Sequence, residues 1–222
     1  MKSLAITSIA VSLAVVALAA QDPVKTDAKH YSVLVDNAAV RVLKASYAPG
    51  ESSTMHQHPD HIAVALSPSK ARFALPDGKT EERDMAAESA MYVPAGSHNP
   101  TNTGTGRIEV IVVEFKAAKP GAAVLPATRA GLNNKLLAEG ARGNAQFVTA
   151  DPTFAEPAGT KHDYDQVVIA LSGGQGMSLS IDGKPAKTNF ARGDVSFIGR
   201  GVGHEAKNTG GKPATFVIVS IK

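Results

Sequence analysis

Four of the seven histidines in this 222-residue sequence lie in two short clusters, His56, His58 and His61 first and His98 later. A neutral imidazole is the commonest protein metal ligand. Side chains alternate between the two faces of a strand, so His56 and His58 point the same way, roughly 6.5 Å apart. Two imidazoles at that spacing can reach one ion. The alternative is that these are surface histidines on a polar loop.

His61 needs a change of chain direction to join them, because its odd spacing from His58 would place it on the opposite face of an unbroken strand. Pro59-Asp60 lies between the two. Proline interrupts strand pairing and Pro-Asp favours a turn, which can bring His61 back to the same side. The same alternation then turns Ala63 inward, and Ile62 outward.

The sequence around these histidines resembles the two signature motifs of the cupin superfamily. The residues that carry the resemblance are Gly50, His56 and His58 for the first motif and Pro94, Gly96, His98 and Asn102 for the second. In cupins these motifs lie on neighbouring strands of a small jelly-roll barrel, with a metal inside its mouth. The resemblance implies that His56, His58 and His98 are metal ligands, and that His61 stands close to the place of the usual glutamate. Glu88 replaces the usual leading glycine of the second motif.

The types of ligand residue limit which metal the site would bind. An ion held by four neutral imidazoles keeps its full +2 charge and is a strong Lewis acid. Imidazole suits Fe, Cu, Ni and Zn, whereas a carboxylate ligand would favour a harder ion such as Mn. We expect one divalent transition metal, and the residues alone leave the choice among these five open.

Glu114 is an acid within an apolar run that the pattern predicts to be a strand. The favoured interpretation is a position that faces solvent near the end of that strand. The alternative is an inward carboxylate that orients one of the ligand histidines.

The second half of the chain repeats the first in order, at an offset of about 105 residues. The matching segments include 62–66 with 167–171, Asp77-Gly78 with Asp182-Gly183, and 102–104 with 208–210. Each copy consists of short β-branched runs between turn residues, which is typical of an all-β sandwich or barrel. Each Asp-Gly pair predicts a tight hairpin.

Together, the repeat and the resemblance predict two tandem double-stranded β-helix modules, which are jelly-roll and cupin-like. We place the N-terminal, metal-binding module at residues 21–116, a linker rich in Ala, Gly and Pro at 117–131, and the C-terminal module at 132–222. Residues 127–137 weakly favour a short helix. The two barrels would join face to face or edge to edge.

The second module does not repeat the histidines. Aligned without gaps, it has Lys161, Asp163, Gln166 and His204 in the places of the four histidines. A lysine ammonium has no lone pair to offer an ion, and His162 falls one residue out of phase. We expect this module to have lost its metal. Its four aligned residues can still form a ligand-binding cleft, and the alternative is a degenerate copy retained for packing.

Residues 1–20 have the features of a secretory signal peptide: Lys2, an apolar stretch over 4–18, and an A-x-A site. Cleavage is expected near Ala19-Ala20, which would make the mature chain secreted or periplasmic. An uncleaved anchor is the alternative, but the run is shorter than the ~20 residues that a span requires. No other run approaches that length, so we expect no transmembrane span in the mature chain.

Composition excludes several classes of function. The chain has no cysteine, which rules out disulfides, thiolate metal sites and cysteine nucleophiles. The formal charge is +3, with no basic stripe and no tryptophan, so nucleic-acid binding gains no support.

The resemblance implies a metal-dependent small-molecule enzyme of dioxygenase-like type. No Ser/His/Asp arrangement or carboxylate pair stands out, so the ion would carry the chemistry. The alternatives are a non-catalytic periplasmic metal- or ligand-binding protein and a metal-dependent isomerase. We expect a small-molecule ligand or substrate and no nucleic acid, and a homodimer is one assembly that stays open.

Overall fold

The computed structural model describes residues 21–116 and 129–222, and almost all regular structure in them is β-strand. The predicted signal peptide, the predicted cleavage site and residues 117–128 of the predicted linker lie outside the described residues. The described chain holds one helical turn, α1 (Pro23–Thr26). Within it, no helix combines the length and the apolar character that crossing a membrane requires.

The N-terminal half forms a five-stranded sheet, β1-β2-β9-β4-β7, and a four-stranded sheet, β3-β8-β5-β6, with all pairs antiparallel. The strands are β1 (Tyr31–Asp36), β2 (Val40–Tyr47), β3 (His56–His58), β4 (His61–Ala65), β5 (Ser69–Ala74), β6 (Thr80–Met85), β7 (Ala90–Val93), β8 (Gly96–Asn102) and β9 (Ile108–Phe115). Side chains from both sheets, among them Tyr31, Leu43, Ala71 and Val112, form the buried interior of this barrel.

The C-terminal half repeats this arrangement in sheets β10-β11-β17-β12-β15 and β14-β13-β16. Its strands are β10 (Leu132–Gly140), β11 (Gly143–Ala150), β12 (Asp165–Ser172), β13 (Met177–Ile181), β14 (Lys184–Thr188), β15 (Val195–Ile198), β16 (His204–Asn208) and β17 (Ala214–Ile221). The matching strand orders confirm the tandem repeat. The short strand β3 has only an isolated bridge, Thr160 with His204, as its counterpart.

Turn residues explain the two predicted hairpins. Asp77-Gly78 connects β5 to β6, and Asp182-Gly183 connects β13 to β14. Asp182 and Gly183 both have positive φ, 49° and 72°, as a type I′ turn requires. The weakly favoured helix at 127–137 is wrong where the structure describes it, because 132–137 belong to β10, which pairs with β11 along its whole length.

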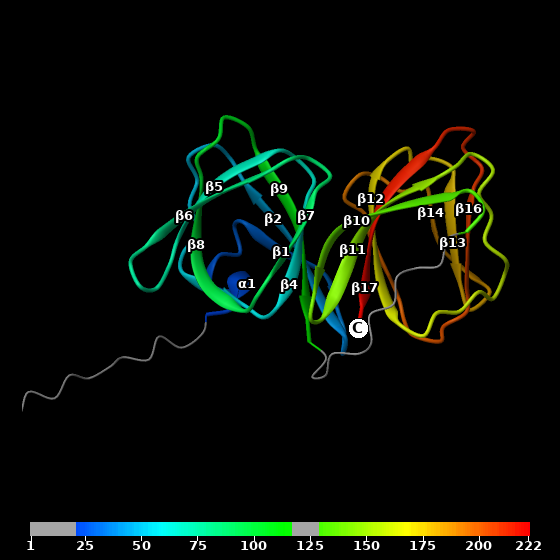
Figure 1. Cartoon of the computed structure of the whole chain (residues 1–222), viewed down its shortest axis with the longest axis horizontal. Helices are drawn as coiled ribbons and strands as arrows, with labels where there is room; N and C mark the ends of the chain where they lie inside the picture. The colour runs from blue at the N-terminus through cyan, green and yellow to red at the C-terminus, as the bar shows by residue number, and fades with distance from the viewer. Residues whose placement is uncertain (1–20, 117–128) are drawn as a thin grey trace, which may run out of the picture.

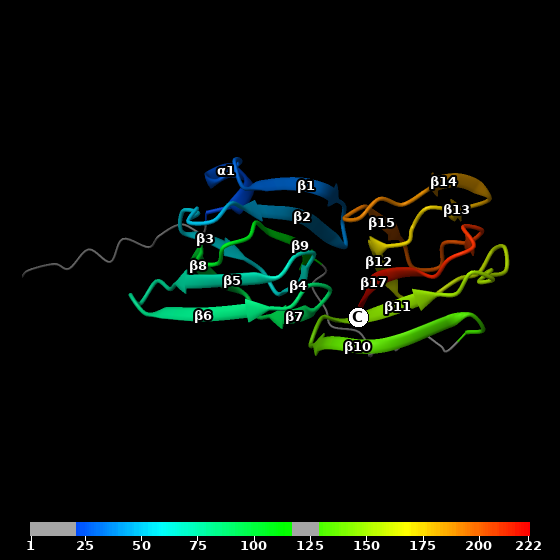
Figure 2. The ribbon, with the colours of Figure 1, turned by 90° about the horizontal axis from the view of Figure 1, so that it is seen from above.

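The two barrels lie side by side and share one core (Figures 1 and 2). Side chains on the outer faces of the two five-stranded sheets form this core. They include Ile62 and Val113 from the N-terminal half and Val167 and Val219 from the C-terminal half. The approach is close: a Cβ at Gly143 in the C-terminal half would lie 2.8 Å from Cζ of Phe115 in the N-terminal half. The sheets therefore pack face to face, and their outer surfaces are not solvated where they meet.

The inner face of each barrel surrounds a cavity of about 90 Å³. In the N-terminal barrel His61 and Ala63 line this cavity, while Ile62 and Val64 lie in the shared core. The predicted alternation along β4 is therefore confirmed. It leaves small side chains on the face that looks into the cavity.

Candidate metal centre

Strand pairing brings three of the predicted histidines together. In the β3–β8 ladder His56 lies directly opposite His98, and His58 follows two residues later on the same face. The ligand nitrogens of His56, His58 and His98 all lie within 4.8 Å of one another. His56 and His58 are only 1% and 2% exposed. This is a buried cluster rather than the polar loop that was the alternative.

Hydrogen bonds hold two of these rings, those of His56 and His58, in a tautomer that binds metals. Nδ1 of His56 lies 2.8 Å from the Thr54 carbonyl oxygen, and Nδ1 of His58 lies 2.6 Å from Glu114 Oε1. A carbonyl or a carboxylate only accepts, so each Nδ1 carries the hydrogen and each Nε2 keeps its lone pair. The Nε2 atoms of His56 and His58 are therefore available to bind a metal.

Burial keeps two of the three histidines of the cluster, His56 and His98, neutral. Burial, and then the nearby His58, lowers the pKa of His56 to about 4. Burial lowers the pKa of His98 to about 2, with further contributions from the neighbouring imidazoles. Converging imidazole nitrogens in a buried site suit a divalent transition metal, so the donor set fits the predicted cofactor.

His61 lies beside this group. Its ring centroid is 4.9 Å from that of His58, and its Nδ1 lies 2.8 Å from the Pro59 carbonyl oxygen, so its Nε2 is also free. The preceding turn is pinned, because the Asp60 carboxylate accepts hydrogen bonds from Tyr92 Oη and the Ala95 amide. His61 stays a predicted fourth ligand, outside the three-residue cluster.

Glu114 does not face solvent, so the favoured interpretation of this residue is wrong. It is 1% exposed and accepts hydrogen bonds from His58 Nδ1 at 2.6 Å and Arg41 Nε at 2.5 Å. Burial raises its pKa, but these hydrogen bonds outweigh burial and hold the pKa below its usual value. At this end of β9 one face lines the barrel and the other lies in the shared core, so neither face is open to water.

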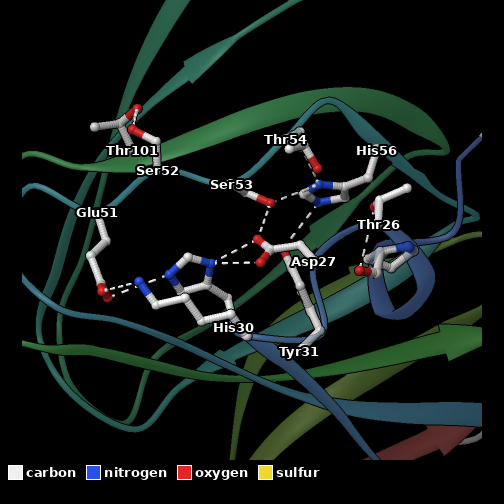
Figure 3. Close-up of polar contacts among 12 residues, drawn as sticks. Thr26, Asp27, His30, Tyr31, Glu51, Ser52, Ser53, Thr54, His56 and Thr101 are labelled. Carbon is white, nitrogen blue, oxygen red and sulfur yellow. Dashed lines mark hydrogen bonds and ion pairs between the residues drawn. The ribbon is translucent and has the colours of Figure 1, made fainter.

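Tyr31 was not predicted as part of the site. Its hydroxyl lies 3.0 Å from His56 Nε2, and burial raises its pKa well above the usual value, so it is a hydrogen donor there. The neighbouring polar cluster holds His56 from the other side, with Ser53 between Asp27 and His56 Nδ1 (Figure 3). No sequence signal links Tyr31 to a histidine 25 positions later, because β-pairing between distant segments brings them together.

The second module places its predicted residues differently. Gln166 and His204 line the C-terminal cavity, whereas Lys161 and Asp163 are exposed and lie outside that lining. Thr160 pairs with His204 as His56 pairs with His98, which puts His162 in the place of His58.

The ungapped alignment is therefore out of register by one residue in this segment. The loop before the apolar strand is one residue longer in the second module, and this length difference shifts the register. The structure also adds Glu156, which the sequence analysis missed, to His162 and His204.

The lowered histidine pKa values predict acid sensitivity of the metal-free protein. Five histidines are affected: His56, His61, His98, His162 and His204. Below their ordinary pKa of 6.5 the unfolded chain binds protons that the folded chain excludes, so stability falls as pH falls. Each histidine contributes up to about 1.4 kcal/mol per pH unit.

Urea denaturation of the metal-free protein at pH 7.5 and at pH 5 measures this loss, in a window above the titration of ordinary carboxyls. His61→Gln removes one of these five histidines. The change in the free energy of unfolding per pH unit should therefore be smaller by up to about 1.4 kcal/mol. Equal unfolding midpoints at the two pH values would contradict the prediction.

Comparisons with known proteins identify the fold. No protein-family model matches the sequence, and no curated protein does. Among solved structures, AerE from Microcystis aeruginosa superimposes with a TM-score of 0.67 at 15% identity, over 91% of this chain and 97% of that chain. A cupin 2 conserved barrel domain protein from Leptotrichia buccalis gives a TM-score of 0.56 at 11% identity, over 86% and 88%.

A third structure, the salicylate 1,2-dioxygenase from Pseudoaminobacter salicylatoxidans in adducts with gentisate, gives a TM-score of 0.63 at 10% identity. It covers 92% of this chain and 75% of that chain. At these identities the similarity establishes the fold alone. The predicted all-β, cupin-like jelly-roll fold is confirmed.

Proposed function

We propose that the N-terminal barrel binds one divalent transition metal through His56, His58 and His98, with His61 as fourth ligand. We further propose that the protein is a metal-dependent enzyme of dioxygenase-like type that acts on a small organic acid. The observation that carries this proposal is the convergence of three imidazole nitrogens beside an apolar cavity. Apolar cavities with a few convergent polar groups are the usual form of small-molecule sites.

A metal bound there would act as a Lewis acid toward a substrate oxygen or O₂. The surrounding residues set the conditions for this. Glu114 fixes the ring of His58 and adds negative charge behind it. The lining residues Ala63, Met91 and Val112 keep the space dry and leave room for a ligand.

Tyr31 has a role that depends on the metal. Its buried hydroxyl donates to His56 Nε2, but that lone pair would belong to the ion when metal is bound. A buried donor without an acceptor is costly, at about 1–3 kcal/mol. The hydroxyl would therefore turn to an oxygen of the bound substrate and orient it.

Arg83 on β6 supports an acidic substrate. Of the described residues that line the cavity, it alone carries a full charge at neutral pH. Its guanidinium lies 4.7 Å over the Phe73 ring and donates to Glu81 Oε2 at 2.7 Å, which holds it at the cavity wall. A guanidinium presents paired donors that match a carboxylate. Salicylate, named in the description of one structural neighbour, is an organic acid of this kind.

Oxygen uptake by the metal-loaded protein, measured across a panel of aromatic and aliphatic carboxylates and their neutral amides, tests the function. We expect uptake with an acid and little with its amide. Arg83→Ala should raise KM for the acid about tenfold or more, since a charge-assisted pair contributes about 1.5–3 kcal/mol, and change kcat less.

Arg72→Ala is the control, because Arg72 is exposed on β5 and pairs with Glu82 on the outer surface. Absence of uptake and of product with each candidate metal would reject the enzymatic function in favour of a binding protein. Product formation without uptake of O₂ would favour an isomerase.

Export is part of the proposal and rests on residues 1–20. N-terminal sequencing of the protein recovered from the periplasm of a bacterial host tests it, with a start just after Ala19 or Ala20 expected. An intact Met1 would contradict it.

A further inference from the structure

The C-terminal barrel contains a second cluster of possible metal ligands. The ligand atoms of Glu156, His162 and His204 all lie within 4.8 Å of one another, at one end of the apolar cavity of this barrel. Glu156 and His204 are buried, and Glu156 Oε2 lies 3.3 Å from His204 Nε2. Two imidazoles and one carboxylate are a common ligand set for divalent transition metals.

The imidazoles of this cluster are uncharged. Burial and then Arg129 lower the pKa of His162 to about 4, and burial lowers the pKa of His204. Nδ1 of His204 lies 3.3 Å from the Val202 carbonyl oxygen, which turns Nε2 toward Glu156. The cluster therefore offers two neutral nitrogens and one negative charge to a cation.

A positively charged side chain, Arg129, already lies among these ligand groups. The guanidinium of Arg129 forms a close ion pair with Glu156 through Nη1, and its Nη2 lies 3.1 Å from His162 Nε2. A guanidinium has only donors and keeps its charge at all ordinary pH values. The guanidinium contacts two of the three ligand groups, Glu156 and His162. A metal ion bound to the same groups would clash with the guanidinium and would be repelled by its positive charge.

The N-terminal cluster differs on this point. There the guanidinium of Arg41 donates to Glu114 Oε2, while His58 donates to Glu114 Oε1. Arg41 thus lies behind the carboxylate rather than among the imidazole nitrogens. The positive charge there supports the site without occupying it.

We propose that the C-terminal barrel carries a masked divalent-metal site, formed by Glu156, His162 and His204 and blocked by the guanidinium of Arg129. In the native chain Arg129 takes the place of the ion, which confines metal binding to the N-terminal barrel. This inference goes beyond the proposed function, because it concerns a different module and different ligands.

The test counts metal ions per chain. Metal-free wild type, Arg129→Ala and Arg129→Gln are loaded with Zn²⁺ alone, desalted and measured by elemental analysis. We expect each Arg129 variant to hold one ion more than wild type. Arg200→Ala is the matched control, since Arg200 is exposed in the same barrel, and it should hold the wild-type number.

Double variants locate the additional ion. Arg129→Ala combined with Glu156→Gln or with His162→Ala should return to the wild-type count. Arg129→Gln keeps most of the side chain, so a folding defect of the alanine variant does not obstruct the experiment. Circular dichroism establishes that each variant is folded before metal is added.

The test compares the number of ions per chain in each variant with that in wild type, so its outcome does not depend on whether the N-terminal cluster binds metal. If the N-terminal cluster binds no metal, the expected counts become none for wild type and one for Arg129→Ala. Equal counts in folded wild type and both Arg129 variants would overturn the masked site. A wild-type ion whose retention requires Glu156 would overturn it too, because Arg129 would then not be blocking.

Discussion

Replacing His58 with alanine is expected to abolish tight metal binding by the protein. The ring of His58 is central to the cluster, with its centroid 4.9 Å from that of His56, 4.9 Å from that of His61 and 5.3 Å from that of His98. The loss should exceed the roughly 10- to 100-fold reduction that follows removal of an outer hydrogen-bond partner of a ligand. Titration of the metal-free variant with Zn²⁺ in a calorimeter measures it.

His162→Ala is the matched control, because His162 occupies the corresponding place in the C-terminal barrel. Its metal content should equal that of wild type, since Arg129 already occupies that cluster. Equal losses of affinity in the two variants would contradict the assignment of the site to the N-terminal barrel.

The second large effect is expected at Glu114. Its carboxylate accepts hydrogen bonds from two donors, His58 Nδ1 and Arg41 Nε, whereas a glutamine has one oxygen and one amide group to offer them. Glu114→Gln should therefore lower metal affinity roughly 10- to 100-fold. Glu114→Ala removes one of the two carboxylates paired with Arg41, which keeps Asp22, and should destabilise the fold by about 1–3 kcal/mol.

Calorimetric titration measures the first effect and urea denaturation of the metal-free protein measures the second. The control is Glu109→Gln on the same strand, where the carboxylate is half-buried and pairs with Lys44. Such a pair contributes at most about 1 kcal/mol, and the residue is remote from the histidines. Unchanged affinity in Glu114→Gln would show that Glu114 does not support the metal ligands.

The features that were predicted correctly depend on short sequence patterns. His56 and His58 lie two residues apart on one strand, and alternation alone sets their common direction. The Pro59-Asp60 turn allowed His61 to be placed inward, with Ala63. The strand orders follow from a repeat whose segments keep their order, and its Asp-Gly turns mark the same hairpin in both halves.

The features that were missed depend on which surfaces meet. Glu114 was expected to face water because it lies near the end of its strand, on the same side as Lys116. Here the outer face packs on the second barrel, which leaves residues 111–115 of β9 buried on both sides. That contact joins segments about a hundred positions apart, and it has no local signature in the sequence.

The same limit applies to the polar clusters. Tyr31 reaches His56 from β1, and Arg129 reaches Glu156 and His162 from the segment before β10. The one-residue shift of His162 has a different origin, since a longer loop changes strand register without altering the composition of the segment. An alignment without gaps has no means of detecting such a shift.

The central claim is that the histidine cluster of the N-terminal barrel holds one metal ion. Anomalous diffraction from crystals of the metal-supplemented native protein tests it most directly. We expect one strong peak, roughly 2.1 Å from the Nε2 atoms of His56, His58 and His98, at the distance usual for metal–imidazole bonds. A peak at similar distance from His61 Nε2 would establish the fourth ligand. A map with no peak among these nitrogens, or with its only peak at Glu156, would contradict the account.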